Sequence, residues 1–276
     1  MTTVIADDTD SPVIRKPNMA WRVVSAVPPA LWTLIVLVGV WELCVQLAQV
    51  PAYILPAPSA IGAEFASYWH RLLPNAFVTL SEVLIGFLCA VAVGVPLAVM
   101  IVYSRAMEKA VYPLIVASQT VPKVAIAPLL LTWFGYGMTP KIVIVVLLSF
   151  FPIVINSVMG LKSSSREMLY LARSMGASGW QTFWKFRLPQ ALPSIFAGLK
   201  LATVLSVIGA IVAEFIGADK GLGYLILVAG ANFDITRQFA AIILITLIGV
   251  IFFVTLEQLE RVFIPWKSRS TVAGEG

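Results

Sequence analysis

Charged residues are scarce in this sequence of 276 residues. Asp, Glu, Lys and Arg together make up 12% of it, about half of what a soluble domain carries. Hydrophobic residues make up 59%, which is more apolar surface than a single core of this length can bury. Lipid must therefore be the solvent for much of the chain, and we expect an integral membrane protein.

Histidine and cysteine are also rare: the chain has one histidine, His70, and two cysteines, Cys44 and Cys89. Both cysteines lie inside apolar runs, and we interpret them as buried structural thiols. This composition excludes a Cys/His metal cluster and a Ser-His-Asp triad, and it argues against a membrane enzyme. The sequence also lacks a G-x-x-x-x-G-K-[ST] phosphate loop, so we expect no ATP hydrolysis and no cofactor in this chain.

Six apolar runs are long enough to cross a membrane as helices, which need about 20 mostly apolar residues each. They are 29–50, 77–103, 112–134, 142–161, 195–216 and 239–259. We expect a short amphipathic helix from Ser59 before the second run, and a glycine-rich loop after the fifth. Pro122 and Pro128 interrupt the third run, which predicts a broken or partly re-entrant helix. The predicted fold class is an all-α integral membrane protein with about six transmembrane helices.

The basic residues predict the orientation of these spans. Six spans put both termini on one side, where most of the lysines and arginines lie. The other side holds only Arg71, Lys141, Lys220 and Arg237. The positive-inside rule therefore places both termini in the cytoplasm. The net charge of +5 then reports topology and not a nucleic-acid partner, because basic and aromatic residues do not interleave on one face.

The predicted organisation has three parts. A polar cytoplasmic tail covers 1–27, a transmembrane domain covers 28–266 with a cytoplasmic loop at 162–192, and a second cytoplasmic tail covers 267–276. The first tail has no apolar segment followed by a small-residue cleavage site, so we do not interpret it as a signal peptide. The sequence has no clear internal repeat, which argues against a secondary transporter.

The polar loop after the fourth run carries the most informative pattern. It predicts a helix, a break at Gly176 and Gly179, and a second helix that presents Trp180, Phe183 and Trp184 at helical spacing. Aromatic side chains flanked by basic residues anchor protein interfaces. A loop helix lying among lipid headgroups has the same pattern. On the pattern alone, both interpretations stay open.

The spacing in this loop resembles the signature loop of ABC importer membrane subunits. In that family a Glu-Ala-Ala triplet precedes a Gly, and an aliphatic-x-Leu-Pro follows. Here the triplet position is Tyr170-Leu171-Ala172, followed by Gly176-Ala177 and by Phe186-Arg187-Leu188-Pro189. Tyr170 replaces the leading Glu and Phe186 replaces Ile, so the contact with an ATPase departs from the family pattern.

Other segments extend the resemblance over most of the chain. Residues 54–59, 122–129 and 133–137, and Glu214 with 221–224, resemble the nitrate/sulfonate/taurine-type branch. That branch also includes importers of pyrimidine precursors. The resemblance implies a permease subunit of a binding-protein-dependent ABC importer in the bacterial cytoplasmic membrane. Its solute would be a small organic or anionic compound, such as a sulfonate, taurine, nitrate or a pyrimidine precursor.

The resemblance also implies partners and coupling residues. A second copy of this chain would complete the pathway, a cytoplasmic ABC ATPase dimer would carry ATP and Mg, and an extracytoplasmic binding protein would deliver the solute. The residues that match the coupling loop are Ala172, Arg173, Gly176, Ala177, Trp180, Phe183, Trp184, Leu188 and Pro189. The alternative, a stand-alone secondary transporter or channel, would have no use for such a loop.

Polar residues inside the apolar runs supply candidates for the solute pathway. An ionisable residue there costs at least about 2.5 kcal/mol on insertion scales, so each invites a functional hypothesis. The candidates are Gln119, Lys123, Asn156, Ser206 and Glu214. Lys123 would suit an anionic solute, and the alternative is a salt bridge to Glu82 or Glu214. Helix–helix hydrogen bonds explain Asn156 and Ser206 equally well.

Overall fold

The computed structural model describes residues 29–266, and the predicted tails over 1–27 and 267–276 lie outside this range. The chain divides into two compact units, one up to Val50 and one from Pro51. Helix α2 (Pro29–Leu47) belongs to the first unit. Its segment Leu31–Leu47 is apolar but shorter than a full span, so the first apolar run forms a helix somewhat shorter than expected.

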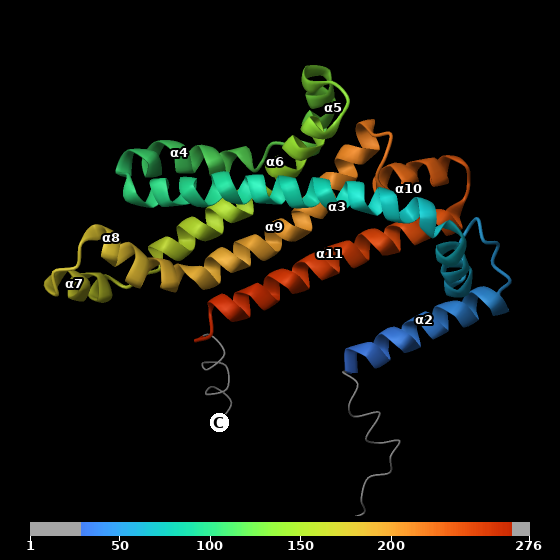
Figure 1. Cartoon of the computed structure of the whole chain (residues 1–276), viewed down its shortest axis with the longest axis horizontal. Coiled ribbons are helices and arrows are strands. Elements are labelled where there is room, and N and C mark those ends of the chain that lie inside the picture. Colours follow the sequence, from blue (N-terminus) through green and yellow to red (C-terminus); the bar gives the residue numbers. More distant parts are fainter. Residues whose placement is uncertain (1–28, 267–276) are drawn as a thin grey trace, which may run out of the picture. The chain divides into compact units, whose positions relative to one another are not determined.

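The second unit is an assembly of helices (Figure 1). In chain order they are α3 (Pro58–Tyr103), α4 (Arg105–Ser118), α5 (Lys123–Phe134), α6 (Met138–Lys162), α7 (Arg166–Ser174), α8 (Gly179–Thr182), the π-helical turn η1 (Phe183–Arg187), α9 (Leu188–Gly217), α10 (Leu222–Ala231) and α11 (Ile235–Phe263). Figure 1 shows α7 and α8 at the opposite end of this unit from α10.

Four helical stretches in the described residues are long and apolar enough to cross a membrane: Pro58–Tyr103, Met138–Lys162, Gly179–Gly217 and Ile235–Phe263. The pair α4 and α5 adds a fifth if it is one span, and it bends by 95° at the break between the two helices. The broken or re-entrant third run is therefore confirmed. The bend has a plain cause, because Pro122 disfavours a helical conformation at Val121 and cannot donate a helix hydrogen bond.

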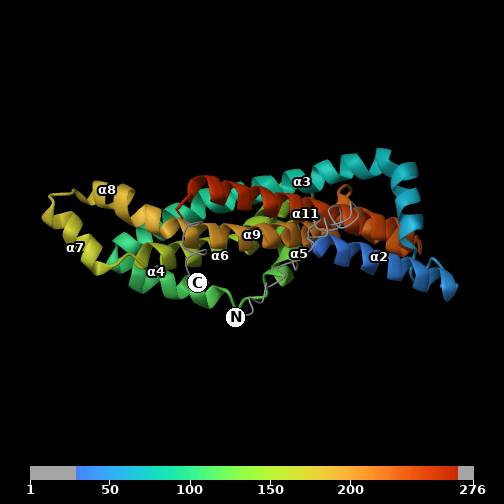
Figure 2. The same ribbon diagram turned by 90° about the horizontal axis from the view of Figure 1, so that it is seen from below.

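Two expectations about the connecting segments are wrong. The amphipathic helix at Ser59 is not separate from the second run, because α3 continues through Pro74. Figure 2 shows a sharp bend in the N-terminal part of α3, as a proline inside a helix produces. The expected glycine-rich loop contains the ten-residue helix α10, which begins at Leu222 directly after Gly221.

The core of the second unit lies where four helices meet. Phe87 and Ala90 of α3, Ile153 of α6, Ala202 of α9 and Leu256 of α11 form one buried cluster. Small residues in the cluster let the helices approach closely, as is usual when helices pack in lipid. Many large apolar side chains outside this cluster are exposed, among them Leu88, Val93, Leu247 and Ile251. Cys44 and Cys89 are both free and exposed, so the prediction that they are buried thiols is wrong.

Candidate functional site

The loop after α6 forms a helical hairpin, which we define as α7, α8 and η1. Ser165 caps the start of α7, and its hydroxyl accepts a hydrogen bond from the Met168 N–H at 3.2 Å. Gly176 closes α7 with a φ of +76°, a conformation that favours glycine. Ser178 then starts α8 through a capping box with Gln181. The predicted order of helix, glycine break and second helix is confirmed.

The hairpin exposes large apolar side chains. Met175 is 75% exposed and Trp180 is 71% exposed, and Tyr170, Leu171 and Trp184 are each at least half exposed. We call these five residues the hairpin surface. Leu171 and Met175 lie one turn apart on α7, so they present one apolar patch. Helix α7 is not a candidate span, whereas α8 and η1 form the first part of the candidate span Gly179–Gly217. The apolar patch on α7 therefore lies outside the spans, and such a patch indicates an interaction surface.

Two of the predicted coupling residues are buried. Ala172 is fully buried, and Phe183 is 9% exposed. Phe183 packs with Leu161, Ala191 and Ile195, which joins η1 to α6 and α9. These two side chains anchor the hairpin to the spans, and the exposed residues around them form its outer surface.

The other predicted coupling residues occupy distinct places. Gly176 makes the turn, Arg173 is exposed on α7, and Ala177 is half-buried. Leu188 and Pro189 lie at the start of α9, with the proline in its first turn.

Sequence reasoning missed the hairpin surface on α7. The motif accounts for Tyr170 and Leu171 only as the triplet position of the signature loop, and it says nothing of Met175. The sequence does carry a signal for this exposed surface. Tyr170, Leu171 and Met175 lie in a short polar segment and not in a long apolar run, and Gly176 follows Met175 directly.

A buried polar cluster lies at the other end of the second unit, where α10 begins. The Glu214 carboxylate of α9 accepts a hydrogen bond from the Thr79 hydroxyl at 2.6 Å and another from the Gly223 N–H. The Thr79 hydroxyl in turn accepts from the Leu222 N–H at 2.9 Å. The Asn75 side-chain carbonyl accepts from the Gly221 N–H at 2.7 Å. Side chains of α3 and α9 therefore satisfy the free backbone donors at the start of α10.

Gly221 is required by this arrangement. Its φ is +117°, and a Cβ there would collide with the Glu214 carboxylate. Both the backbone conformation and the close approach exclude other residues. The cluster therefore fixes the position of α10 against α3 and α9.

A buried ion pair lies in the same part of the unit. The Lys141 ammonium lies 2.8 Å from a carboxylate oxygen of Glu82, and the two side chains are 6% and 1% exposed. The salt bridge from Lys123 to Glu82 or Glu214 is therefore wrong. Lys123 instead lies over the Phe151 ring, 4.2 Å from its centroid. The predicted topology counts Lys141 only as one of the few basic residues on the side opposite the termini.

The remaining pathway candidates have local partners. The Asn156 amide donates to the Pro152 carbonyl at 2.9 Å, and the buried Ser206 hydroxyl donates to the Thr203 carbonyl at 2.7 Å. These are bonds within α6 and α9, which explain the residues without a solute. Gln119 is exposed in the break between α4 and α5. A role for these residues along the solute pathway stays a prediction.

Comparison with known proteins decides the family. The model of the binding-protein-dependent transport system inner membrane component family matches residues 83–265. The chain belongs to this family. It is thus a multi-pass inner-membrane permease subunit of an ABC importer, it is not itself catalytic, and it works with a binding protein and an ATPase. The alternative of a stand-alone transporter or channel is excluded.

Curated relatives cover nearly the whole chain. The formylaminopyrimidine transport permease protein ThiX of Halalkalibacterium halodurans is 37% identical over 90% of this chain and 99% of that protein. The riboflavin transport system permease protein RibX of Chloroflexus aurantiacus is 36% identical over 86% and 89%. The putative aliphatic sulfonates transport permease protein SsuC of Escherichia coli is 34% identical over 83% and 88%. The resemblance to this branch is confirmed.

A solved structure supports the fold. A chain of the MetNI methionine ABC transporter in an inward-facing conformation matches with a TM-score of 0.61. The match covers 71% of this chain and 98% of the other, at 18% identity. The predicted all-helical permease fold is confirmed.

Proposed function

We propose that the hairpin of α7, α8 and η1 is where the partner ATPase transmits force to this permease. The observation that carries the proposal is the hairpin surface, in which Met175 and Trp180 are the most exposed members. Exposed aromatic and methionine side chains are the residues that protein interfaces bury. The buried Phe183 links this surface to α6 and α9, so a displacement of the hairpin would reach both spans.

The test is ATP-dependent uptake by the transporter reconstituted in vesicles with its ATPase and binding protein. We expect Leu171→Asp to lower uptake at least about tenfold, because a buried unpaired carboxylate is costly at an interface, and to reduce ATPase co-purification. Glu167→Gln is the matched control, since Glu167 is an exposed polar residue of the same helix. Uptake and ATPase co-purification by Leu171→Asp that equal those of Glu167→Gln would contradict the proposal.

We infer that both termini and the hairpin face the cytoplasm and that two copies of this chain form the transporter. Arg173, Lys185 and Arg187 lie on or beside the hairpin, in agreement with the positive-inside rule. A C-terminal fluorescent-protein fusion tests the orientation, since it should fluoresce where a C-terminal alkaline phosphatase fusion stays inactive. Co-purification of two differently tagged copies tests the homodimer, and a complex with only one tagged copy would contradict it.

The solute proposed for this importer is a small organic compound. The relatives named for formylaminopyrimidine and riboflavin are 37% and 36% identical to this chain, and the relative named for aliphatic sulfonates is 34% identical. Lys123, which is not paired with a carboxylate among the described residues, would favour an anion along the pathway. Uptake of labelled formylaminopyrimidine, riboflavin and an alkyl sulfonate side by side would separate these classes.

A further inference from the structure

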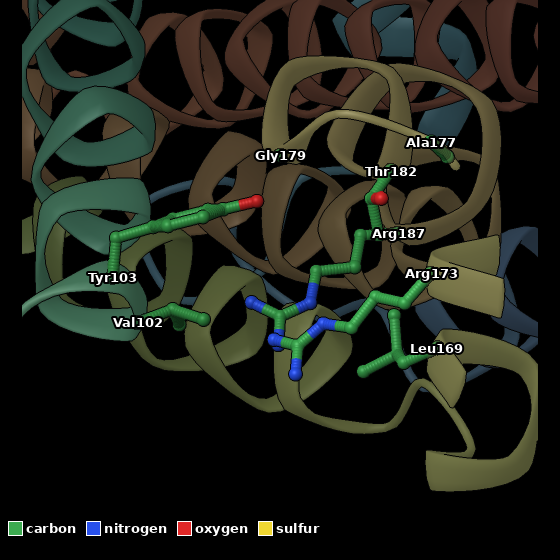
Figure 3. Close-up of a pocket in the computed structure, with 8 residues that line it drawn as sticks. All are labelled: Val102, Tyr103, Leu169, Arg173, Ala177, Gly179, Thr182 and Arg187. Atoms are coloured by element: carbon green, nitrogen blue, oxygen red, sulfur yellow. The ribbon is translucent and has the colours of Figure 1, made fainter.

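Two arginines line one pocket between the hairpin and the end of α3. Arg173 of α7 and Arg187 of η1 share this pocket with Tyr103, and its volume is about 260 Å³. Figure 3 shows both guanidinium groups and the Tyr103 ring directed toward the same space. The Arg187 guanidinium also lies over the Tyr103 ring, 5.2 Å from its centroid. The pocket therefore holds two fixed positive charges at the end of a membrane span.

These two charges have no acidic partner in residues 29–266. Neither Arg173 nor Arg187 takes part in an ion pair there, and no Asp or Glu lines the pocket. Five other cations among the described residues differ in this respect, since Lys141, Lys162, Lys200, Arg237 and Arg261 each bind a carboxylate. Two arginines that repel each other in one pocket form a site for an anion, and guanidinium groups bind phosphate bidentately.

An apolar pocket adjoins the cationic one. It has a volume of about 240 Å³ and is lined by Val99, Tyr103, Gly179, Trp180 and Phe183. Tyr103 and Gly179 line both pockets, so the two lie next to each other. Val99 lies within the span α3, one turn before Tyr103. The combination of a cationic end and an apolar end matches an amphiphile and not a free ion.

We propose that this double pocket binds an anionic phospholipid of the leaflet on the hairpin side. The phosphate would lie between Arg173 and Arg187, and the start of an acyl chain would lie against Val99 and Phe183. Basic pockets beside transmembrane helices bind anionic headgroups in this way, and Tyr and Trp are typical of the headgroup level. Trp180 belongs both to the hairpin surface and to the apolar pocket, whereas Tyr103, Val99 and Arg187 line the pockets without belonging to the hairpin surface. The bound lipid would hold the hairpin to α3 and so stabilise the segment on which the ATPase acts.

The test is native mass spectrometry of the purified full chain in detergent, titrated with phosphatidylglycerol or with phosphatidylcholine of the same acyl chains. We expect phosphatidylglycerol to bind at about tenfold lower concentration. The double variant Arg173→Gln/Arg187→Gln should weaken its binding at least about tenfold, since each charge-assisted hydrogen bond contributes substantially. Arg173→Gln alone, at an exposed position, should give a smaller loss in the same direction.

Arg105→Gln is the matched control, because Arg105 is an exposed arginine next to the end of α3 that does not line the pocket. It should leave phosphatidylglycerol binding unchanged. Equal binding of the two lipids, or binding unaffected by the double variant, would overturn the proposal. Displacement of the lipid by millimolar inorganic phosphate would identify a simple ion site. Loss of the lipid on assembly with the ATPase would assign the arginines to an ATPase carboxylate instead.

Discussion

The two ends of the helical unit differ in how they treat polar and apolar groups. At one end, Glu214, Thr79 and Asn75 are drawn into hydrogen bonds with the start of α10, and Lys141 is paired with Glu82. At the other end, Met175 and Trp180 project from the hairpin. The first end buries polar groups with their partners inside the chain, and the second leaves large apolar side chains mostly exposed.

This difference separates residues that stabilise the fold from residues that bind a partner protein. A buried carboxylate that accepts two hydrogen bonds stabilises the fold around it. We call the cluster of Glu214, Thr79 and Asn75 the clamp, because it holds the start of α10. An exposed apolar surface gains nothing until a partner covers it. Changes in the clamp should therefore appear first as lost stability, and changes in the hairpin surface as lost coupling.

The largest effect is expected at the buried ion pair. Lys141→Ala leaves the Glu82 carboxylate buried without its partner, which costs about 3–5 kcal/mol of stability. A double apolar replacement, Glu82→Leu with Lys141→Met, should recover much of that loss, since both charges are gone. Lys162→Ala is the control, because the Lys162–Glu108 pair is 39% and 42% exposed. Thermal unfolding in detergent measures all three, and an equal loss in the control would contradict the assignment.

Within the hairpin, Phe183 and Trp180 should behave differently. Phe183→Ala removes a side chain packed among Leu161, Ala191 and Ile195 and should cost about 3 kcal/mol. Trp180→Ala, at a side chain that is 71% exposed, should leave the unfolding temperature nearly unchanged and lower ATP-dependent uptake. Unfolding and uptake measured on the same two variants test this split. Equal effects of both substitutions on stability would remove the distinction between anchor and surface.

The Glu214 clamp should give an intermediate effect. Glu214→Ala leaves the Gly223 N–H buried without an acceptor, which costs about 1–3 kcal/mol. Ser206→Ala, in the same helix, removes only a hydroxyl that donates to the Thr203 carbonyl and should cost less. Hydrogen exchange of the α10 amides resolves the effect, since faster exchange confined to α10 is expected in Glu214→Ala. Unchanged exchange there would show that the carboxylate does not hold α10.

A small stability effect is expected at Lys123. Lys123→Ala removes a cation over the Phe151 ring, a contact that contributes about 0.5–1 kcal/mol at a partly exposed site. If the transported solute is anionic, the same variant should raise the KM for uptake without changing the unfolding temperature appreciably. Lys123→Arg should retain a low KM. An unchanged KM in Lys123→Ala would leave Lys123 outside the pathway.

The sequence predicted the hairpin well because its signals are local. Ser165, Gly176 and Ser178 specify where helices begin and end through bonds to nearby backbone groups, and such signals need no tertiary information. The broken third run was predictable for the same reason, from Pro122. The long spans followed from apolar length alone.

The parts that could not be predicted depend on contacts between distant residues. Glu214 and Thr79 are 135 positions apart, and Lys141 and Glu82 are 59 apart. Lys123 lies inside the third apolar run and Lys141 lies directly before the fourth. The pattern of these runs could not decide which of the two pairs with Glu82. The sequence did not predict helix α10, because its glycines are common in loops. The side chains that accept hydrogen bonds from its first N–H groups come from α3 and α9, which are distant in the sequence. The continuation of α3 past Pro74 was missed because proline there bends the helix without ending it.

The central claim is that the hairpin surface contacts the ATPase while the clamp end does not. A photo-crosslinker attached to Met175→Cys, in a chain with Cys44→Ser and Cys89→Ser, tests it in the assembled transporter. Tyr136→Cys is the control, because Tyr136 is 85% exposed in the tight loop between α5 and α6. We predict an adduct with the ATPase from position 175 and none from position 136. An adduct from position 136, or none from position 175, would contradict the account.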